Sequence, residues 1–366
     1  MKKDFQIQPL SAWLKVDRPI LISGPCSAEN EAQTVTTCKQ IRALNKVHVL
    51  RAGIWKPRTR PGQYEGAGLP GLDWLIKAKQ ETGLPVTTEV ATAAHVEAAL
   101  KAGVDILWIG ARTTVNPFSV QEVADALQGV DIPVMVKNPV NPDIELWMGA
   151  LERLQRAGIK TMAAIHRGFS SFEKGPFRNA PMWELAIEMK TRLPELEMIC
   201  DPSHICGNRE LLSFVAQKGL DLDMSGLMIE SHINPDVALS DAKQQVTPAN
   251  LGKLLEGLIV RKASVNDKNF KDTLSILREQ IDQIDDDLMN KLAARMKISE
   301  QIGTYKKENG VTILQVNRWE EIIHTRLAQG RAMGLTDEFV SDMLKLLHNE
   351  SIQVQQKVMN KTAERV

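Results

Sequence analysis

The feature that most constrains this chain is a short apolar run that recurs through the first two-thirds of the sequence. The runs are residues 19–22, 47–50, 85–90, 106–109, 133–136, 161–165, 198–200 and 226–229. The stretches between them have helical spacing, and several end in a glycine, as helix C-termini favour: Gly83, Gly103, Gly158 and Gly219. Alternating strands and helices predict a parallel sheet with right-handed crossovers, and eight units without a ninth predict a closed (β/α)8 barrel, the TIM barrel.

An open, doubly wound sheet is the alternative arrangement of the same elements. It would need a glycine-rich dinucleotide-binding turn after the first strand, and Gly24-Pro25-Cys26-Ser27 is not such a turn. The barrel is therefore favoured, and it places the chemistry just beyond the C-terminal ends of the strands.

The last hundred residues have a different pattern. Thr247 and Pro248 are an N-cap and a first helical residue that open a helix to about Arg261, and the polar segment 262–268 reads as a linker. From residue 269 to about 307 apolar residues recur at helical spacing, and two shorter helical stretches follow, 317–332 and 336–360. We therefore expect a barrel domain, 1–262, and a small all-α domain, 269–366.

Charge and composition limit the class of function. The 366 residues are 43% hydrophobic and carry 45 basic and 45 acidic side chains, so net charge supports neither nucleic-acid nor membrane-surface binding. No apolar run is long enough to cross a bilayer, and no apolar segment follows the N-terminus, so we expect a cytoplasmic protein. The four irregularly spaced cysteines indicate reduced thiols.

Every expected strand ends in polar or ionisable groups. The loop after the second strand is the most basic, with Arg51, Lys56, Arg58 and Arg60 in ten positions. A solvated surface loop could explain this loop alone. It does not explain the groups at the other strand ends: Cys26, Glu89, Arg112, Lys137, His166, Arg167, Asp201, His204, Glu230 and His232. So many cations suit two phosphorylated substrates, or a phosphate beside a carboxylate and a second phosphate.

Three of these strand-end groups, with Asp241 further beyond the last strand, form a plausible set of metal ligands: Cys26, His204, Glu230 and Asp241. A thiolate, an imidazole and two carboxylates do not select one metal, and Mn, Fe, Co, Zn or Cu would each fit. We expect Cys26 to be exposed at a turn, because Gly-Pro precedes it and Ser follows it. The other three cysteines are expected to be small buried apolar residues.

Seven motifs in order resemble the short type I beta branch of the 3-deoxy-D-arabino-heptulosonate 7-phosphate (DAHP) synthases, over about residues 1–262. They are Gly24-Pro25-Cys26-Ser27, Lys56-Pro57-Arg58-Thr59, Gly110-Ala111-Arg112, Val136-Lys137-Asn138, His166-Arg167-Gly168, Asp201-Pro202-Ser203-His204 and Ile229-Glu230-Ser231-His232. The resemblance implies a metal-dependent condensation of phosphoenolpyruvate with D-erythrose 4-phosphate, the first step of the shikimate pathway.

The same resemblance implies roles for individual residues. Arg51, Lys56, Arg112, Lys137 and Arg167 would hold phosphoenolpyruvate, and Lys56, Pro57, Arg58 and Thr59 would meet the aldose phosphate. Asp201 would be a further substrate-binding residue. Cys26, His204, Glu230 and Asp241 would bind a divalent metal, with manganese the first candidate, and Lys56 would protonate the developing alkoxide.

The chain departs from the family at Arg60, where serine is usual. The related 3-deoxy-octulosonate 8-phosphate synthases are the alternative, with the helical domain serving only as a ligand sensor and dimeriser. A non-enzymatic alternative for the whole chain is a sugar-phosphate-binding barrel with a helical dimerisation domain.

The spacing of cations on the long helix constrains the second domain. Arg295 and Lys306 share a face about 16 Å apart, whereas Arg278 lies roughly 25 Å before Arg295 and about 100° off that face. One small ligand could meet all three only if a second chain supplied Arg278, which implies an intertwined homodimer. Ser351 and Gln355 share a face of the last helix.

These positions, with Arg318, resemble the all-helical chorismate mutases over about residues 269–360. The resemblance implies a cofactor-free rearrangement of chorismate to prephenate, in which Arg278, Arg295 and Arg318 pair with carboxylates. Lys306 and Gln355 would face the ether oxygen, and Ser351 would assist at a carboxylate. Trp319 stands where family members commonly have Glu, so a sensor and dimerisation module is the alternative. Feedback of chorismate or prephenate on the barrel and fusion for co-expression alone are equal hypotheses for why one chain carries both domains.

Overall fold

The computed structural model describes residues 6–58, 61–172, 175–262 and 267–360. The chain divides into two compact units, Met1–Ala263 and Ser264–Val366.

The first unit is the predicted barrel. Its eight strands are all parallel and close on themselves, because β8 pairs with β1 in register from Ile20↔Gly226 to Gly24↔Glu230. The strands are β1 Ile20–Gly24, β2 Val49–Arg51, β3 Val86–Val90, β4 Ile106–Ile109, β5 Val134–Lys137, β6 Met162–His166, β7 Glu197–Cys200 and β8 Gly226–Glu230. The prediction of a closed barrel is confirmed.

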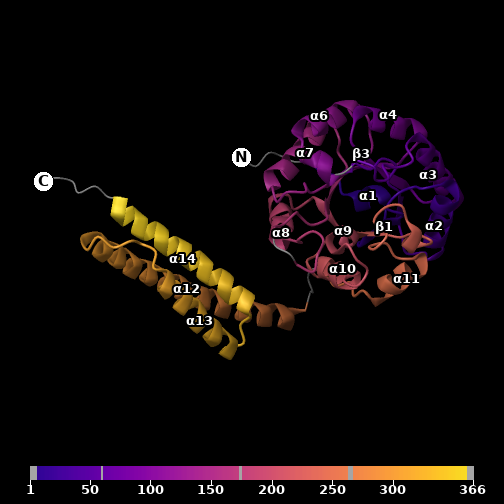
Figure 1. The fold of residues 1–366 in the computed structure, drawn as a ribbon. Helices are drawn as coiled ribbons and strands as arrows, with labels where there is room; N and C mark the ends of the chain where they lie inside the picture. The colour runs from indigo at the N-terminus through magenta and orange to yellow at the C-terminus, as the bar shows by residue number, and fades with distance from the viewer. Residues whose placement is uncertain (1–5, 59–60, 173–174, 263–266, 361–366) are drawn as a thin grey trace. The chain divides into compact units, whose positions relative to one another are not determined.

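Helices form a ring outside the strands (Figure 1). They are α2 Glu31–Ala43, α3 Leu69–Thr82, α4 Ala93–Ala102, α6 Pro117–Ala126, α7 Ile144–Arg156, α8 Trp183–Arg192, α10 Leu212–Asp221 and α11 Pro248–Gly257. Two short helices, α5 Ala111–Thr114 and α9 Pro202–Cys206, each begin two residues after a strand ends, β4 and β7 respectively, and a 3-10 turn, η1 Pro235–Val237, follows β8.

The barrel has an inner and an outer core. The inner core fills the space between the strands with apolar side chains such as Trp108 and Met228, and Leu10 of helix α1 (Leu10–Leu14) packs into it. Helix α1 is held at the N-terminal end of β7, where buried Glu197 accepts from the backbone and hydroxyl of Ser11 at 2.8 and 2.5 Å. One end of the barrel is therefore closed by α1, and the other is left for the strand-end residues.

Two local predictions are wrong. Gly83 and Gly103 cap α3 and α4 with φ of 71° and 88°, as predicted, but Gly219 lies inside α10. A Cβ there would lie 2.9 Å from Cys200 Cβ, so Gly219 allows α10 to approach β7 closely. Helix α11 begins at Pro248 as predicted but ends at Gly257, because Leu258 is extended.

The second unit consists of α12 Lys268–Glu308, α13 Val316–Ala332 and α14 Asp337–Asn360. The 41 residues of α12 make a helix about 60 Å long. Asp267 caps it, and α14 lies along it (Figure 1). Gly303 of α12 allows close packing, since a Cβ there would lie 3.0 Å from the Cα of Gln355. Much of the apolar face of α12 is exposed in the single chain, including Leu277, Ile281, Ile284, Leu288 and Ile298. None of the described helices is long and apolar enough to pass through a membrane.

Candidate active site

Three of the four predicted metal ligands converge at the C-terminal end of the barrel. Cys26 follows β1, Glu230 is the last residue of β8, and Asp241 lies in the loop after η1. One sulfur and one carboxylate oxygen from each acid lie within 4.8 Å of one another. Cys26 Sγ and Asp241 Oδ2 lie 3.4 Å apart.

The fourth predicted ligand, His204, stands beside this group. Asp201 caps α9 by accepting from the backbone N–H of His204, and its Oδ2 lies 2.8 Å from His204 Nδ1. His204 Nε2 is thereby turned toward Glu230 and lies 3.9 Å from its Oε1. Burial lowers the pKa of His204, which favours the neutral imidazole that a metal needs.

Cys26 is buried, which corrects the expectation that it is exposed at a turn. Gln245, in the loop after β8, accepts from Cys26 N at 2.9 Å, and Lys56 Nζ lies 3.1 Å from the sulfur. Burial, helped by the negative charge of Glu230, raises the pKa of the Cys26 thiol to about 12.

The group fits a divalent cation. Glu230 Oε1 is buried and accepts no hydrogen bond from the described residues, although Arg51 Nη2 lies 3.2 Å away. Soft sulfur, imidazole nitrogen and hard carboxylate oxygen together suit a transition metal without selecting one.

Buried amides hold the loops that carry these ligands. Gln245 is fully buried; its Oε1 accepts from Cys26 N at 2.9 Å and its Nε2 donates to Ser240 O at 2.8 Å. Gln244 Nε2 donates to Glu230 Oε2 at 2.7 Å. Asp241 has a φ of 47°, a left-handed conformation that the surrounding hydrogen bonds fix.

The buried predicted cations line the same end of the barrel. Arg51, only 1% exposed, pairs with Glu230 and lies over the Trp108 ring, with its Cζ 4.8 Å from the ring centroid. Lys137 Nζ lies 2.9 Å from Asp201 Oδ2. Burial lowers the pKa of Arg167 to about 10, which leaves it charged at neutral pH. These groups form a positively charged floor that is mostly shielded from water.

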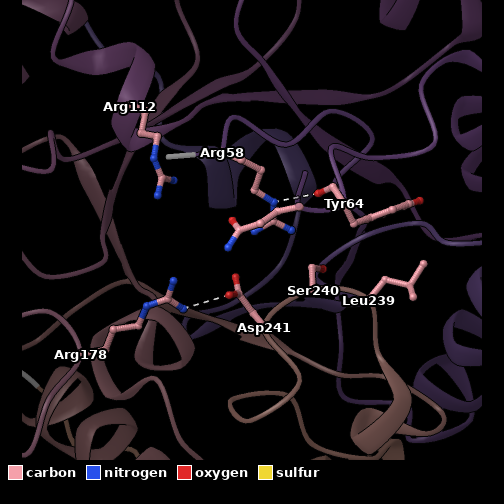
Figure 2. Close-up of a pocket in the computed structure, with 8 residues that line it drawn as sticks. Arg58, Tyr64, Arg112, Arg178, Leu239, Ser240 and Asp241 are labelled. Carbon is pink, nitrogen blue, oxygen red and sulfur yellow. Dashed lines mark hydrogen bonds and ion pairs between the residues drawn. The ribbon is translucent and has the colours of Figure 1, made fainter. Parts of the chain in front are cut away.

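An open pocket lies next to Asp241. It has a volume of about 450 Å³ and is lined by Arg58, Gln63, Tyr64, Arg112, Arg178, Leu239, Ser240 and Asp241. Figure 2 shows Arg58, Arg112 and Arg178 around one space, with Asp241 facing Arg178. Pro57 is half-buried in the loop before Arg58, whereas Thr59 and Arg60 lie outside the described residues.

In the helical unit, the structure brings two predicted residues into contact. Arg295 Nη1 of α12 donates to Ser351 Oγ of α14 at 2.5 Å and to Leu347 O at 3.2 Å. Gln355, one turn beyond Ser351, has a buried Oε1 that accepts no hydrogen bond from the described residues. Lys306 Nζ donates to Ile313 O at 2.6 Å.

The other predicted cations of this unit are not brought to Arg295. Arg278 is exposed on the same continuous helix, seventeen residues earlier. Arg318 is exposed and pairs with Glu321 at 2.6 Å. Its neighbour Trp319 stacks on His348, with ring centroids 4.0 Å apart.

Comparison with known proteins then decides the family. The model of the DAHP synthetase I family matches residues 15–264, more than half of the chain. The chain belongs to the DAHP synthetase I family. Residues 277–356 match the chorismate mutase type II family, so a DAHP synthetase I domain is fused to a C-terminal chorismate mutase type II domain.

Relatives of this DAHP synthetase I chain include a phospho-2-dehydro-3-deoxyheptonate aldolase of Thermotoga maritima. It is 30% identical over 62% of the chain, and the match spans 64% of that relative's length. A 2-dehydro-3-deoxyphosphooctonate aldolase of Polaromonas naphthalenivorans is 28% identical over 67% of the chain and 90% of its own length. The crystal structure of the DAHP synthase from Thermotoga maritima superposes with a TM-score of 0.59 at 28% identity, covering 65% of this chain and 67% of that one.

Several residues at this end of the DAHP synthetase I barrel were missed by reasoning from strand ends. Arg178 lies in the loop between β6 and α8, and Gln244 and Gln245 lie beyond η1. Trp108 is inside β4, where an aromatic residue reads as core. Of these residues, only Arg178 could have been predicted as a site residue, because it lies in the long loop that begins with Arg167-Gly168 after β6.

Proposed function

We propose that the barrel condenses phosphoenolpyruvate with D-erythrose 4-phosphate to give DAHP and inorganic phosphate. The observation that carries this proposal is the ligand group Cys26, Glu230 and Asp241 beside a floor of buried cations and an open basic pocket. A family model over residues 15–264 supports the same reaction.

Each group of residues has a proposed task. Arg51, Lys137 and Arg167 bind the carboxylate and phosphate of phosphoenolpyruvate, since charged hydrogen bonds are strong where water is excluded. Cys26, His204, Glu230 and Asp241 hold a divalent ion, manganese being the first candidate. Such an ion supplies Lewis acidity toward an aldehyde oxygen.

Lys56 is the proposed proton donor. Its ammonium lies 3.1 Å from Cys26 Sγ and therefore beside the ligand group. The enol carbon of phosphoenolpyruvate forms a bond to the aldehyde carbon, and Lys56 gives a proton to the alkoxide that results. Water then adds to the cationic carbon, and phosphate leaves from it. Arg58, with Pro57 and Thr59 of the same loop, receives the aldose phosphate, and Arg112 and Asp201 complete the substrate contacts.

A second candidate differs only in the aldose. Relatives named 2-dehydro-3-deoxyphosphooctonate aldolases match the chain at 25–28% identity over 65–70% of its length. An eight-carbon product needs a five-carbon aldose phosphate in the pocket of about 450 Å³.

Release of inorganic phosphate separates these candidates. Phosphoenolpyruvate and manganese are supplied with either D-erythrose 4-phosphate or a five-carbon aldose 5-phosphate. We expect the higher kcat/KM with the four-carbon aldose. A preference for the five-carbon aldose supports the second candidate, and no phosphate release with either aldose refutes both and leaves a binding protein.

For the helical domain, about residues 269–366, we propose rearrangement of chorismate to prephenate. Arg295 and Ser351 are already paired, and buried Gln355 has an amide oxygen with no hydrogen bond from the described residues. Arg278 is too far along α12 to serve the same ligand, and the apolar face of that helix is exposed. Both observations support a homodimer in which the partner supplies Arg278.

Two measurements test this second proposal. The rate at which chorismate absorbance falls should be proportional to enzyme concentration. Light scattering should give twice the monomer mass. Prephenate added to the barrel assay tests feedback of a downstream ligand: lower phosphate release supports it, and unchanged kinetics support fusion for co-expression.

A further inference from the structure

Arg178 lines the pocket from the loop between β6 and α8 and not from the end of a strand. Hydrogen bonds and close packing hold its backbone in place. The backbone N–H groups of Arg178 and Asn179 donate to Cys206 O and Ile205 O of α9, at 3.3 and 3.1 Å. A Cβ on Gly207 would lie 2.5 Å from Arg178 Cβ, so the segment is packed against the end of that helix. The position of the Arg178 backbone is therefore fixed relative to His204.

Asn179 fixes the same segment to two proposed site residues. Its Oδ1 accepts from Arg167 Nη1 at 2.7 Å, and its Nδ2 donates to His204 O at 2.6 Å. The dipeptide Arg178-Asn179 thus connects the phosphoenolpyruvate cations, the metal ligands and the pocket.

The side chain of Arg178 reaches Asp241 from the pocket side. Its Nη1 lies 3.0 Å from Asp241 Oδ1 and 2.9 Å from Gln244 Oε1. The other oxygen of Asp241, Oδ2, is the one 3.4 Å from Cys26 Sγ. Asp241 can therefore face the metal group with one oxygen while the other oxygen holds the guanidinium.

The remaining donors of Arg178 are available to a ligand. Its side-chain hydrogen bonds to the described residues all come from Nη1, and its side chain is 43% exposed. Arg58 is oriented in a similar way, because its Nε donates to Tyr64 O at 2.8 Å while its guanidinium faces the pocket (Figure 2).

The charge of the pocket matches a phosphate monoester. Three guanidinium groups and one carboxylate line it, which gives a net charge of +2. A phosphate monoester carries about −1.5 to −2 at neutral pH. Planar guanidinium groups also match the geometry of phosphate oxygens.

We propose that Arg178 binds the phosphate of the aldose substrate, together with Arg58, and that Asp241 Oδ1 holds the Arg178 guanidinium in place. This inference rests on the proposed condensation. It assigns to Arg178 a role in binding the second substrate and not the first, whose buried cations are Arg51, Lys137 and Arg167.

The test compares Arg178→Gln and Arg178→Lys with Arg192→Gln, which removes the same charge from α8, where Arg192 pairs with Glu145 and Glu188 and does not line the pocket. We expect Arg178→Gln to raise the KM for D-erythrose 4-phosphate by about 10- to 100-fold. The KM for phosphoenolpyruvate should change less than about threefold. Arg178→Lys should recover part of the loss, because lysine keeps the charge but not the forked geometry. Arg192→Gln should match wild type.

A metal titration distinguishes substrate binding from support of Asp241. Cobalt(II), followed by its thiolate absorbance, should bind wild type and Arg178→Gln with affinities within about threefold. A cobalt affinity lowered about 10- to 100-fold, with KM for the aldose phosphate unchanged, overturns the proposal and makes Arg178 a positioning residue for the metal.

Failure of this inference can be told apart from failure of the proposed function. A wild-type chain that binds cobalt but releases no phosphate refutes the condensation. A wild-type chain that turns over while Arg178→Lys and Arg178→Gln keep its KM values refutes the role of Arg178. Arg178→Lys carries this comparison if Arg178→Gln does not fold.

Discussion

The clearest perturbation of the proposed metal site is Gln245→Met, which keeps the length of the side chain and removes both of its hydrogen bonds. The substitution leaves the N–H of Cys26 and the carbonyl of Ser240 buried without their partner. Each unsatisfied group costs about 1–3 kcal/mol, so the two together cost about 2–6 kcal/mol. Part of this cost is relieved if the loops carrying Cys26 and Asp241 move apart, and such movement lowers metal affinity by about 10- to 100-fold.

Cobalt(II) titration measures that loss directly, and thermal melting measures the accompanying destabilisation. Gln217→Met is the matched control, because Gln217 also bridges backbone groups, donating to Ile259 O at 3.0 Å and accepting from Ile259 N at 2.8 Å, at a half-buried position. The control should leave cobalt affinity unchanged. The reasoning is refuted if Gln245→Met binds cobalt as tightly as wild type.

Three further predictions concern the N-terminal end of the barrel and the helical domain. Glu197→Gln should lower the melting temperature by roughly 3–12 °C in calorimetry without changing kcat, since it removes a charge-assisted bond to Ser11, and exposed Glu195→Gln should not. A changed kcat would contradict this assignment. Arg295→Met should lower chorismate turnover by about 10²- to 10³-fold and leave phosphate release intact, and equal loss in both assays would contradict it. Trp319→Glu should raise mutase kcat/KM by about tenfold, if an acid there can contact the substrate hydroxyl, and a fall would refute that reading.

The barrel could be predicted from the sequence because strands of a parallel sheet are buried on both faces. Runs such as residues 106–109 are therefore continuously apolar, and all four residues of β4 are buried. The topology then fixed which residues share one end: Glu230 and His204 are neighbours because β8 and α9 are adjacent in the barrel.

Features that depend on irregular loops could not be predicted. The Gly-Pro turn before Cys26 suggested exposure, but loop residues more than two hundred positions later cover it. Gln245 and Arg178 each make two side-chain hydrogen bonds to loop residues, and both lie at positions without periodicity. Glycine at position 219 indicated the end of a helix, but the structure shows that it lies inside α10, where its lack of a side chain lets the helix pack on Cys200.

The central claim is that a divalent ion and a cluster of cations at one end of the barrel drive the condensation, whereas the helical domain works by positioning alone. Phosphate release and chorismate loss measured on the same preparation, before and after EDTA, test it most directly. The account predicts that EDTA stops phosphate release, that added manganese restores it, and that chorismate loss continues throughout. Phosphate release that survives complete removal of metal would contradict it.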